Sequence, residues 1–176
     1  MSLPKREEAL AIMREAGCSR GVVEHCLRVT KIAMRIAIIF VNKGFEVDTN
    51  LVEIGALMHD IGRSRTHSVE HGVIGGQLAR EMGLPEALAR IIERHVGAGI
   101  PSDEATKIGL PMEDYVPETL EEKIVTYADK LVECDREVDI EVTVEKLARE
   151  LGRDHPALER LRALHVEIAN LVGSDF

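Results

Sequence analysis

The stretch Leu57-Met-His-Asp-Ile-Gly-Arg63 places a histidine directly before an aspartate, at the end of an apolar run and just before a glycine. Imidazole and carboxylate groups are good ligands for a divalent cation, and both are costly to bury without a partner. Neighbouring helical residues point about 100° apart, so His59 and Asp60 share one ion only where a helix ends or bends. Gly62 predicts such an end, because glycine is common just past helix C-termini. The meaning of the pair depends on the ligands that the fold brings to it.

The composition predicts one globular domain spanning residues 1–176. An apolar fraction of 45% and a charged fraction of 30% are typical of a chain that folds around a sizeable core. The formal net charge of −9 argues against broad nucleic-acid binding and against binding to anionic membranes. A small anionic substrate stays compatible with this charge if a metal or local arginines offset it.

The cysteines and the lengths of the apolar runs indicate in which cellular compartment the protein is expected. Cys18, Cys26 and Cys134 are scattered and form no CxxC pair, which favours a reducing environment. The longest apolar run, residues 36–41, is too short to span a bilayer or to form the core of a signal peptide. We therefore expect a cytoplasmic protein without a membrane partner, and the sequence leaves a homodimer open.

Apolar periodicity and capping residues predict an all-α fold. Helices are expected at about residues 4–16, 19–43, 50–59, 71–82, 85–95 and 119–132, with C-terminal helices at 143–151 and 156–172 that together occupy about 143–173. Glycine and proline punctuate residues 96–117, which predicts a long loop with one short helix at 102–108. Residues 61–68 are expected to form a loop, and only residues 138–142 alternate at all like a strand.

Several predicted helices carry a metal-type ligand within an apolar stripe, namely at His25, His71, His95 and Asp129. For any one of them, a core residue with a single hydrogen-bonding partner is the commoner explanation. Together with His59 and Asp60 they make six polar groups on stripes that converge on one core, each costing about 1–3 kcal/mol if buried without a partner. One or two shared cations satisfy all six together.

The ordered pattern His25, His59-Asp60, Asp129 resembles the signature of the HD superfamily of metal-dependent phosphohydrolases, and His-Asp-Ile-Gly at 59–62 is one of its recognisable forms. The resemblance covers roughly residues 19–134. It implies a bundle of about five core helices, here with additional N- and C-terminal helices, and a divalent metal held by these four residues. His71 and His95 stand where two-metal branches carry further histidines, among them the HD-GYP phosphodiesterases and the YqeK-type diadenosine-tetraphosphate hydrolases. Small single-domain archaeal HD proteins are the most similar group.

Three departures from the two-metal branches narrow the resemblance. The lysine that follows His-Asp-Ile-Gly in HD-GYP proteins is Arg63 here, and no Gly-Tyr-Pro follows His95. Val96 stands where a second consecutive histidine would supply a third imidazole to the second metal. Hydrolysis of cyclic di-GMP is therefore disfavoured.

The resemblance implies a mechanism in which Asp60 bridges two divalent metals. His25, His59 and Asp129 would complete one metal, and His71 and His95 the other. Ligands without thiolate suit Mn, Fe, Co, Ni or Mg. A metal-activated water would attack a phosphoester or phosphoanhydride bond of a small phosphorylated substrate, of which a nucleotide is the expected class.

Other residues are weaker candidates for contact with the substrate. Arg63, and with less support Arg65, follow the motif and carry guanidinium groups that can bind phosphate. His67 in the same loop and Lys130 beside Asp129 are candidates for contacts around the site. Tyr115 is one of only two tyrosines available to stack on a base, although packing within its own loop is the simpler expectation.

Two other functions fit the same ligands. Some HD proteins with two irons are oxygenases, which mixed-valent iron spectra and oxygen uptake would reveal. A non-catalytic nucleotide-binding regulatory module would bind nucleotides without turnover, but such a module has no need to keep six ligands.

Overall fold

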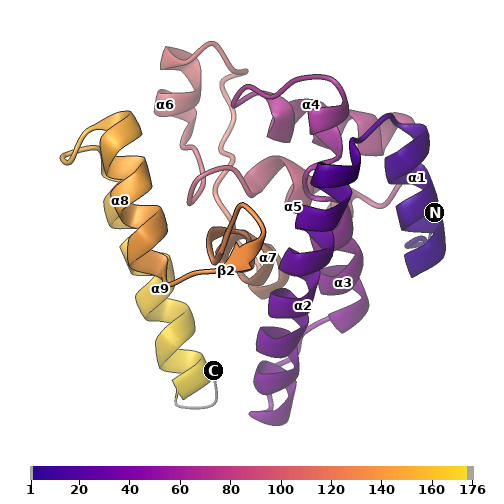
Figure 1. Ribbon diagram of the computed structural model, residues 1–176, viewed down its shortest axis with the longest axis horizontal. Helices are drawn as coiled ribbons and strands as arrows, with labels where there is room; N and C mark the ends of the chain where they lie inside the picture. Colours follow the sequence, from indigo (N-terminus) through magenta and orange to yellow (C-terminus); the bar gives the residue numbers. More distant parts are fainter. Residues whose placement is uncertain (1, 174–176) are drawn as a thin grey trace.

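A computed structural model describes residues 2–173, and it is built almost entirely of helices (Figure 1). The elements are α1 (Arg6–Glu15), α2 (Arg20–Asn42), α3 (Thr49–Met58), the 3₁₀ helix η1 (Ile61–Ser64), α4 (His71–Glu81), α5 (Glu86–Arg94), α6 (Ser102–Lys107), α7 (Leu120–Lys130), β1 (Val132–Glu133), β2 (Arg136–Glu137), α8 (Ile140–Leu151) and α9 (Pro156–Val172). The all-α prediction is confirmed. Helices α2, α3, α4, α5 and α7 pack on one another as the central bundle, with α1 before them and α8 and α9 after them.

Local capping explains where several of these helices begin. The Ser19 side chain accepts a hydrogen bond from the backbone N–H of Val22 at the start of α2. At the start of α3, the Asp48 side chain accepts a hydrogen bond from the backbone N–H of Leu51. The predicted capping box of α7 is present, because Thr119 and Glu122 each accept the other's backbone N–H. These contacts satisfy N–H groups that a helix start leaves without an intrahelical partner.

The buried apolar residues fall into two main clusters that share α2 and α3. One cluster joins these helices to α7, α8 and α9, with Ile36 and Phe40 of α2 at its centre. The other joins them to α1, α4 and α5, with Leu57 and Met58 of α3 among its members. Figure 1 shows α8 on the opposite side of α7 and the hairpin from α2, while α9 packs against α8, α7 and α2. Helix α3 therefore contributes to both clusters, and its last residues, Leu57 and Met58, belong to the second.

Small residues let η1, α4 and α5 approach closely. A Cβ placed on Gly75 of α4 would lie 2.6 Å from the Ile92 side chain of α5. A Cβ on Gly62 would lie 1.9 Å from the backbone oxygen of His71. Both positions therefore require glycine for space, and the contact brings the start of α4 against the end of the His-Asp motif.

Three local expectations are corrected. The helix preceding the motif ends at Met58, so Gly62 is not its terminating glycine but part of η1, which occupies the first half of the predicted loop 61–68. The strands lie at Val132–Glu133 and Arg136–Glu137 rather than at 138–142. The Asp139 side chain accepts the N–H of Glu141, so α8 begins at Ile140 instead of residue 143.

The segment 96–117 is ordered around α6, as predicted for a loop with one short helix. Ile100 and Tyr115 exchange backbone hydrogen bonds and pack in a small third cluster with Ala105 and Leu110. Arg160 of α9 forms an ion pair with Glu104 and donates to the backbone oxygen of Gly99. No helix within residues 2–173 has both the length and the apolar character needed to cross a bilayer.

Candidate metal centre

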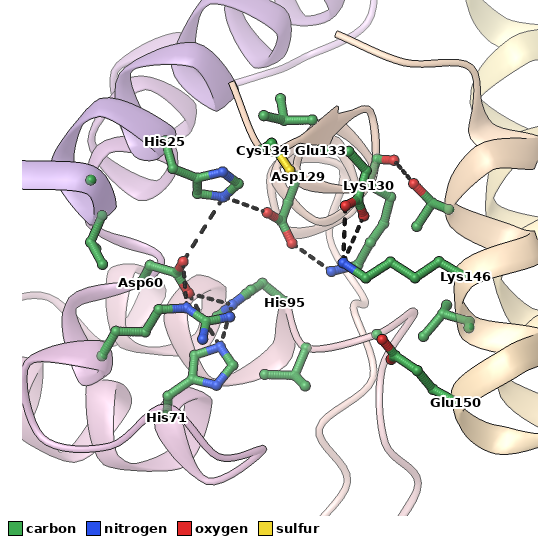
Figure 2. Close-up of a pocket in the computed structure, with 18 residues that line it drawn as sticks. His25, Asp60, His71, His95, Asp129, Lys130, Glu133, Cys134, Lys146 and Glu150 are labelled. Atoms are coloured by element: carbon green, nitrogen blue, oxygen red, sulfur yellow. Dashed lines mark hydrogen bonds and ion pairs between the residues drawn. The ribbon is translucent and has the colours of Figure 1, made fainter. Parts of the chain in front are cut away.

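The six predicted ligands converge at one place from three helices and from the ends of two others. His25 lies near the start of α2, His59 and Asp60 follow α3, His71 opens α4, His95 follows α5, and Asp129 lies near the end of α7. His59 is fully buried, Asp60, His71 and His95 are almost so, and His25 and Asp129 face a cavity of about 480 Å³. Figure 2 shows His25, Asp60, His71, His95 and Asp129 directed toward one another.

The carboxylate of Asp60 divides the surrounding ligands into two groups. Its Oδ1 atom lies 3.2 Å from His71 Nε2 and 3.3 Å from His95 Nε2. Its Oδ2 atom lies 3.9 Å from His25 Nε2 and 3.7 Å from His59 Nε2. One carboxylate therefore faces a pair of imidazoles with each oxygen.

The second group is completed by Asp129. Its Oδ1 atom lies 2.9 Å from His25 Nε2 and 3.4 Å from His59 Nε2. The ligating atoms of His25, His59 and Asp129 all lie within 4.8 Å of one another, and so do those of Asp60, His71 and His95. These are two compact sets of donors of the kind that hold a cation.

Three of the histidines are fixed by the same local hydrogen bond. The Nδ1 atoms of His59, His71 and His95 lie 2.8, 2.7 and 2.6 Å from the backbone oxygens of Ala56, Ser68 and Ile92, each three residues earlier. A backbone carbonyl only accepts, so Nδ1 carries the hydrogen in each ring. In the neutral rings the Nε2 lone pairs then face the centre, which is the arrangement of a metal-binding histidine oriented by a second partner.

Some buried polar atoms of the centre have no hydrogen-bond partner within residues 2–173, and a cation would satisfy them. Among the described residues, His59 Nε2 and Asp60 Oδ1 are buried without a hydrogen-bond partner. His71 Nε2 and His95 Nε2 are 3.1 Å apart, close to Asp60 Oδ1. Facing lone pairs repel and an orphaned buried acceptor is costly, whereas a shared divalent cation satisfies all of these atoms. The imidazole and carboxylate donors therefore fit one or two divalent metals.

The electrostatics of the cluster also favour positive charge. Burial opposes ionisation of Asp60, but attraction to the charged His59 counteracts it, and the pKa of Asp60 lies well below its usual range. Burial likewise opposes ionisation of Asp129, and Lys130, His25 and His59 hold the pKa of that carboxyl well below its usual range. Both carboxylates are thus ionised near neutral pH and available to a cation.

The pKa values of His95 and His59 are shifted in opposite directions. Burial, together with the neighbouring His59 and His71, lowers the pKa of His95 to about 4, so its ring is neutral and can ligate at neutral pH. Burial also disfavours a charged His59, but attraction to Cys26, Asp60 and Asp129 prevails and raises the pKa of His59 well above its ordinary value. His59 must therefore lose a proton when a metal takes that place.

Two cationic side chains border the centre. Arg63 Nε donates to Asp60 Oδ2 at 2.7 Å, and the guanidinium, about a third exposed, lines the cavity. Lys130 Nζ donates to Asp129 Oδ2 at 2.5 Å and lines the same cavity. Both residues therefore stand where they can meet an anionic group bound at the centre.

Three other sequence candidates lie elsewhere. Arg65 is directed to the backbone oxygen of Ala16 and borders a different hollow, beside α1. His67 is exposed and does not line the cavity. Tyr115 is buried in its own loop and does not border the cavity either, so it supplies no stacking surface there.

The structure adds residues that sequence reasoning missed. The buried Cys26 thiol lies with His59 and Asp60 in a third compact set of potential ligands, whereas the sequence indicates only a reducing environment for the cysteines. Glu133, Lys146 and Glu150 border the cavity on the side of α8. The position of Cys26 directly after His25 is a local signal that could have identified it. No local sequence signal identifies Glu133, Lys146 or Glu150 as residues of the cavity.

Comparisons with known proteins identify the family and the fold. Residues 22–133, which include all six candidate ligands, match the family model described as HD domain. The HD domain of the L. monocytogenes phosphodiesterase PgpH, solved in complex with cyclic-di-AMP, has the same fold. It superposes with a TM-score of 0.56 at 14% sequence identity, covering 95% of this chain and 97% of that one.

Two relatives resemble the chain over nearly its whole length. Uncharacterized protein MJ0778 of Methanocaldococcus jannaschii is 51% identical over 166 residues, covering 94% of this chain and 98% of the relative. A Picrophilus torridus protein named tRNA (cytidine(56)-2′-O)-methyltransferase is 39% identical over 173 residues. That match covers 98% of this chain but 49% of the methyltransferase, so the chain spans about half of that relative's length.

Proposed function

Since the chain belongs to the HD-domain family, we propose that it is a metal-dependent phosphohydrolase acting on a small phosphorylated substrate of the nucleotide class. The bond cleaved is a phosphoester or phosphoanhydride bond. The observation that carries the proposal is the division of the Asp60 carboxylate between two imidazole groups, at 3.2 and 3.3 Å on one oxygen and 3.7 and 3.9 Å on the other.

Six residues would hold the metal. His25, His59 and Asp129 form one side, His71 and His95 the other, with Asp60 between them as the shared ligand. The bound cations would supply an activated water and neutralise the charge on the phosphate. The donor set suits Mn, Fe, Co, Ni or Mg, because it combines imidazole and carboxylate groups.

The chain's own residues would orient the substrate. Arg63 is anchored through Nε to Asp60 and lines the cavity, so its terminal nitrogens are available to a phosphate oxygen there. Lys130 is held by Asp129 and becomes available to an anion when a metal shares that carboxylate. Backbone carbonyls hold the hydrogens of His59, His71 and His95 on Nδ1, so these rings act as ligands and not as proton donors.

Named relatives support the nucleotide class. The PgpH HD domain was solved with a cyclic dinucleotide, which contains phosphodiester bonds. The methyltransferase relative is named for an activity on tRNA, but this chain corresponds to about half of that protein. A test panel should therefore contain nucleotides, cyclic nucleotides, dinucleotides and short RNA.

The decisive experiment combines metal analysis with a hydrolysis screen. Protein purified without chelator should contain a first-row divalent metal and should release p-nitrophenol from bis(p-nitrophenyl) phosphate with Mn, Co, Ni, Fe or Mg. Asp60→Asn should lose both properties. A wild-type protein that binds metal but hydrolyses no member of the panel would contradict the proposal. Oxygen consumption by the iron form would point to the oxygenase alternative, and tight nucleotide binding without turnover to a regulatory module.

A further inference from the structure

The cavity that contains the candidate metal centre extends to a second wall. Beyond Asp129 and Lys130 it is bordered by the β1–β2 hairpin and by α8, through Glu133, Cys134, Thr143, Lys146, Leu147 and Glu150. All but the first of these residues follow residue 133, where the match to the HD family ends. Figure 2 shows this wall opposite Asp60 and His71. Most of this wall therefore lies outside the residues that match the family model.

Helix α8 is fixed against the centre by a direct contact. The hydroxyl of Thr143 donates to the backbone oxygen of Lys130 at 2.6 Å, at the end of α7. Lys146 follows Thr143 by three residues, so both side chains project from the same side of α8. The attachment directs Lys146 across the cavity, as Figure 2 shows.

Lys146 is held in place and remains charged. Its Nζ atom donates to Glu133 Oε1 at 3.0 Å and Oε2 at 2.9 Å. The hydrogen bond to Glu133 raises the pKa of Lys146 above its ordinary value. The side chain is still 53% exposed, so an ammonium with three donors is oriented by one carboxylate and open to the cavity.

Two ammonium groups meet in this space. Lys130 reaches it from α7 while paired with Asp129, and Lys146 reaches it from α8 while paired with Glu133. Figure 2 shows the two side chains pointing toward each other between the two carboxylates. Like charges that converge in this way are stabilised by an anion placed between them.

The charge balance of the loaded cavity favours an anion. Three cationic side chains and four carboxylates line it, namely Arg63, Lys130, Lys146, Asp60, Asp129, Glu133 and Glu150. Once a divalent cation is bound by the two aspartates, three cations face two carboxylates. The lining contains no Phe, Tyr or Trp, so recognition depends on charge and hydrogen bonds and not on stacking. A volume of about 480 Å³ is sufficient for a nucleotide-sized ligand.

We propose that Lys146 and Lys130 form a second anion subsite, which selects substrates that carry a further phosphate group besides the one bound at the metal centre. This inference rests on the proposed function, because it takes the metal centre as the site of the first phosphate. Lys146 is the specificity-determining residue, since it belongs to α8 and lies outside the ligand cluster. Glu133 is its positioning residue.

The test compares two ligands that differ by one phosphate. Binding of adenosine 3′,5′-bisphosphate and of adenosine 5′-monophosphate to the metal-loaded protein is measured by calorimetry. The wild type should prefer the bisphosphate by roughly tenfold or more, the usual value of a charge-assisted hydrogen bond. Lys146→Gln should lose this preference while its affinity for the monophosphate stays within about twofold. Lys107→Gln, the same change at an exposed lysine of α6 outside the cavity, should behave like the wild type.

Two results would overturn the subsite. One is a wild type with no preference for the bisphosphate; the other is a Lys146→Gln protein that keeps the preference or weakens both ligands equally. Thermal unfolding of each variant establishes that it is folded, which is expected because the Lys146 side chain is half-exposed. Hydrolysis of bis(p-nitrophenyl) phosphate, which has no second phosphate, reports on the proposed function separately. Selective binding without hydrolysis of this compound or of any member of the substrate panel would retain the subsite and reject the hydrolase.

Discussion

His71 Nε2 and His95 Nε2 lie 3.1 Å apart, while the Nδ1 of each ring donates its hydrogen to a backbone carbonyl. Both histidines are buried, and Asp60 Oδ1 lies within 3.3 Å of each Nε2 atom. Three acceptors thus surround one point. A shared proton or a cation must relieve them, and a divalent cation binds all three lone pairs at once. This arrangement defines the half of the centre on which the two-metal hypothesis depends.

Replacement of His71 should separate metal binding from folding. In His71→Gln the side-chain amide can donate to His95 Nε2 or to Asp60 Oδ1, so the metal-free variant should be as stable as the wild type or more stable by on the order of 1 kcal/mol. The metal content should fall from two ions per chain to one. Chemical denaturation with chelator and metal analysis without it measure the two effects. A wild type that holds one ion, unchanged in the variant, would exclude His71 as a ligand.

Asp60→Asn should abolish the stabilisation that metal gives. A metal at 100 times its dissociation constant stabilises a folded protein by about 2.7 kcal/mol if it does not bind the unfolded chain. The wild type should therefore show a rise in melting temperature with Mn or Co that chelator reverses, and Asp60→Asn should show none. Hydrolysis should fall by more than about 100-fold, the upper range for loss of a residue that only supports a ligand. An unchanged metal response would rule out Asp60 as the shared ligand.

Gly75→Ala tests the packing that brings His71 to His95. The new Cβ would lie 2.6 Å from Ile92 Cγ2, so α4 and α5 must separate or Ile92 must move. Overpacking of this kind costs about 1–3 kcal/mol of unfolding free energy, and metal content should also fall. Gly21→Ala is the matched control, because Ser19 Oγ, the nearest atom to its new Cβ, is 3.9 Å away and alanine favours a helix. Equal stability of the two variants would contradict the packing argument.

The metal-free protein should lose stability as the pH falls from about 6.5 toward 4, in part through His95. Burial keeps the folded pKa of His95 at about 4, below its ordinary value of 6.5. Between pH 6.5 and about 4, His95 is therefore protonated in the unfolded chain but not in the folded chain. Its contribution to stability is present above pH 6.5 and is lost as the pH falls below that value. Denaturation with chelator at several pH values should show a smaller loss in His95→Gln. The difference between the two proteins isolates His95, because His59, whose raised pKa acts in the opposite direction, is present in both. Parallel pH profiles for the two proteins would refute this assignment.

The sequence by itself determined the helices and the composition of the ligand set. Apolar periodicity and the caps at Ser19, Asp48 and Thr119 are local signals, and the structure has helices beginning beside each of them. The four histidines and two aspartates of the ligand set can be identified from the sequence, because polar groups on apolar stripes are buried together and a common partner satisfies them. The hydrogen bonds that fix His59, His71 and His95 are also local, since each spans three residues.

Only the tertiary structure decided how these residues are used. The division of the Asp60 carboxylate, with His71 and His95 on one oxygen and His25 and His59 on the other, follows from packing α2, α4 and α5 around the end of α3. Gly62 was interpreted as a helix stop, but its role is to let the backbone of α4 approach within a distance that a Cβ would block. Lys146 gave no local signal, because it reaches the cavity only through the docking of α8 on α7. Contacts between residues far apart in the chain depend on packing, which local periodicity does not encode.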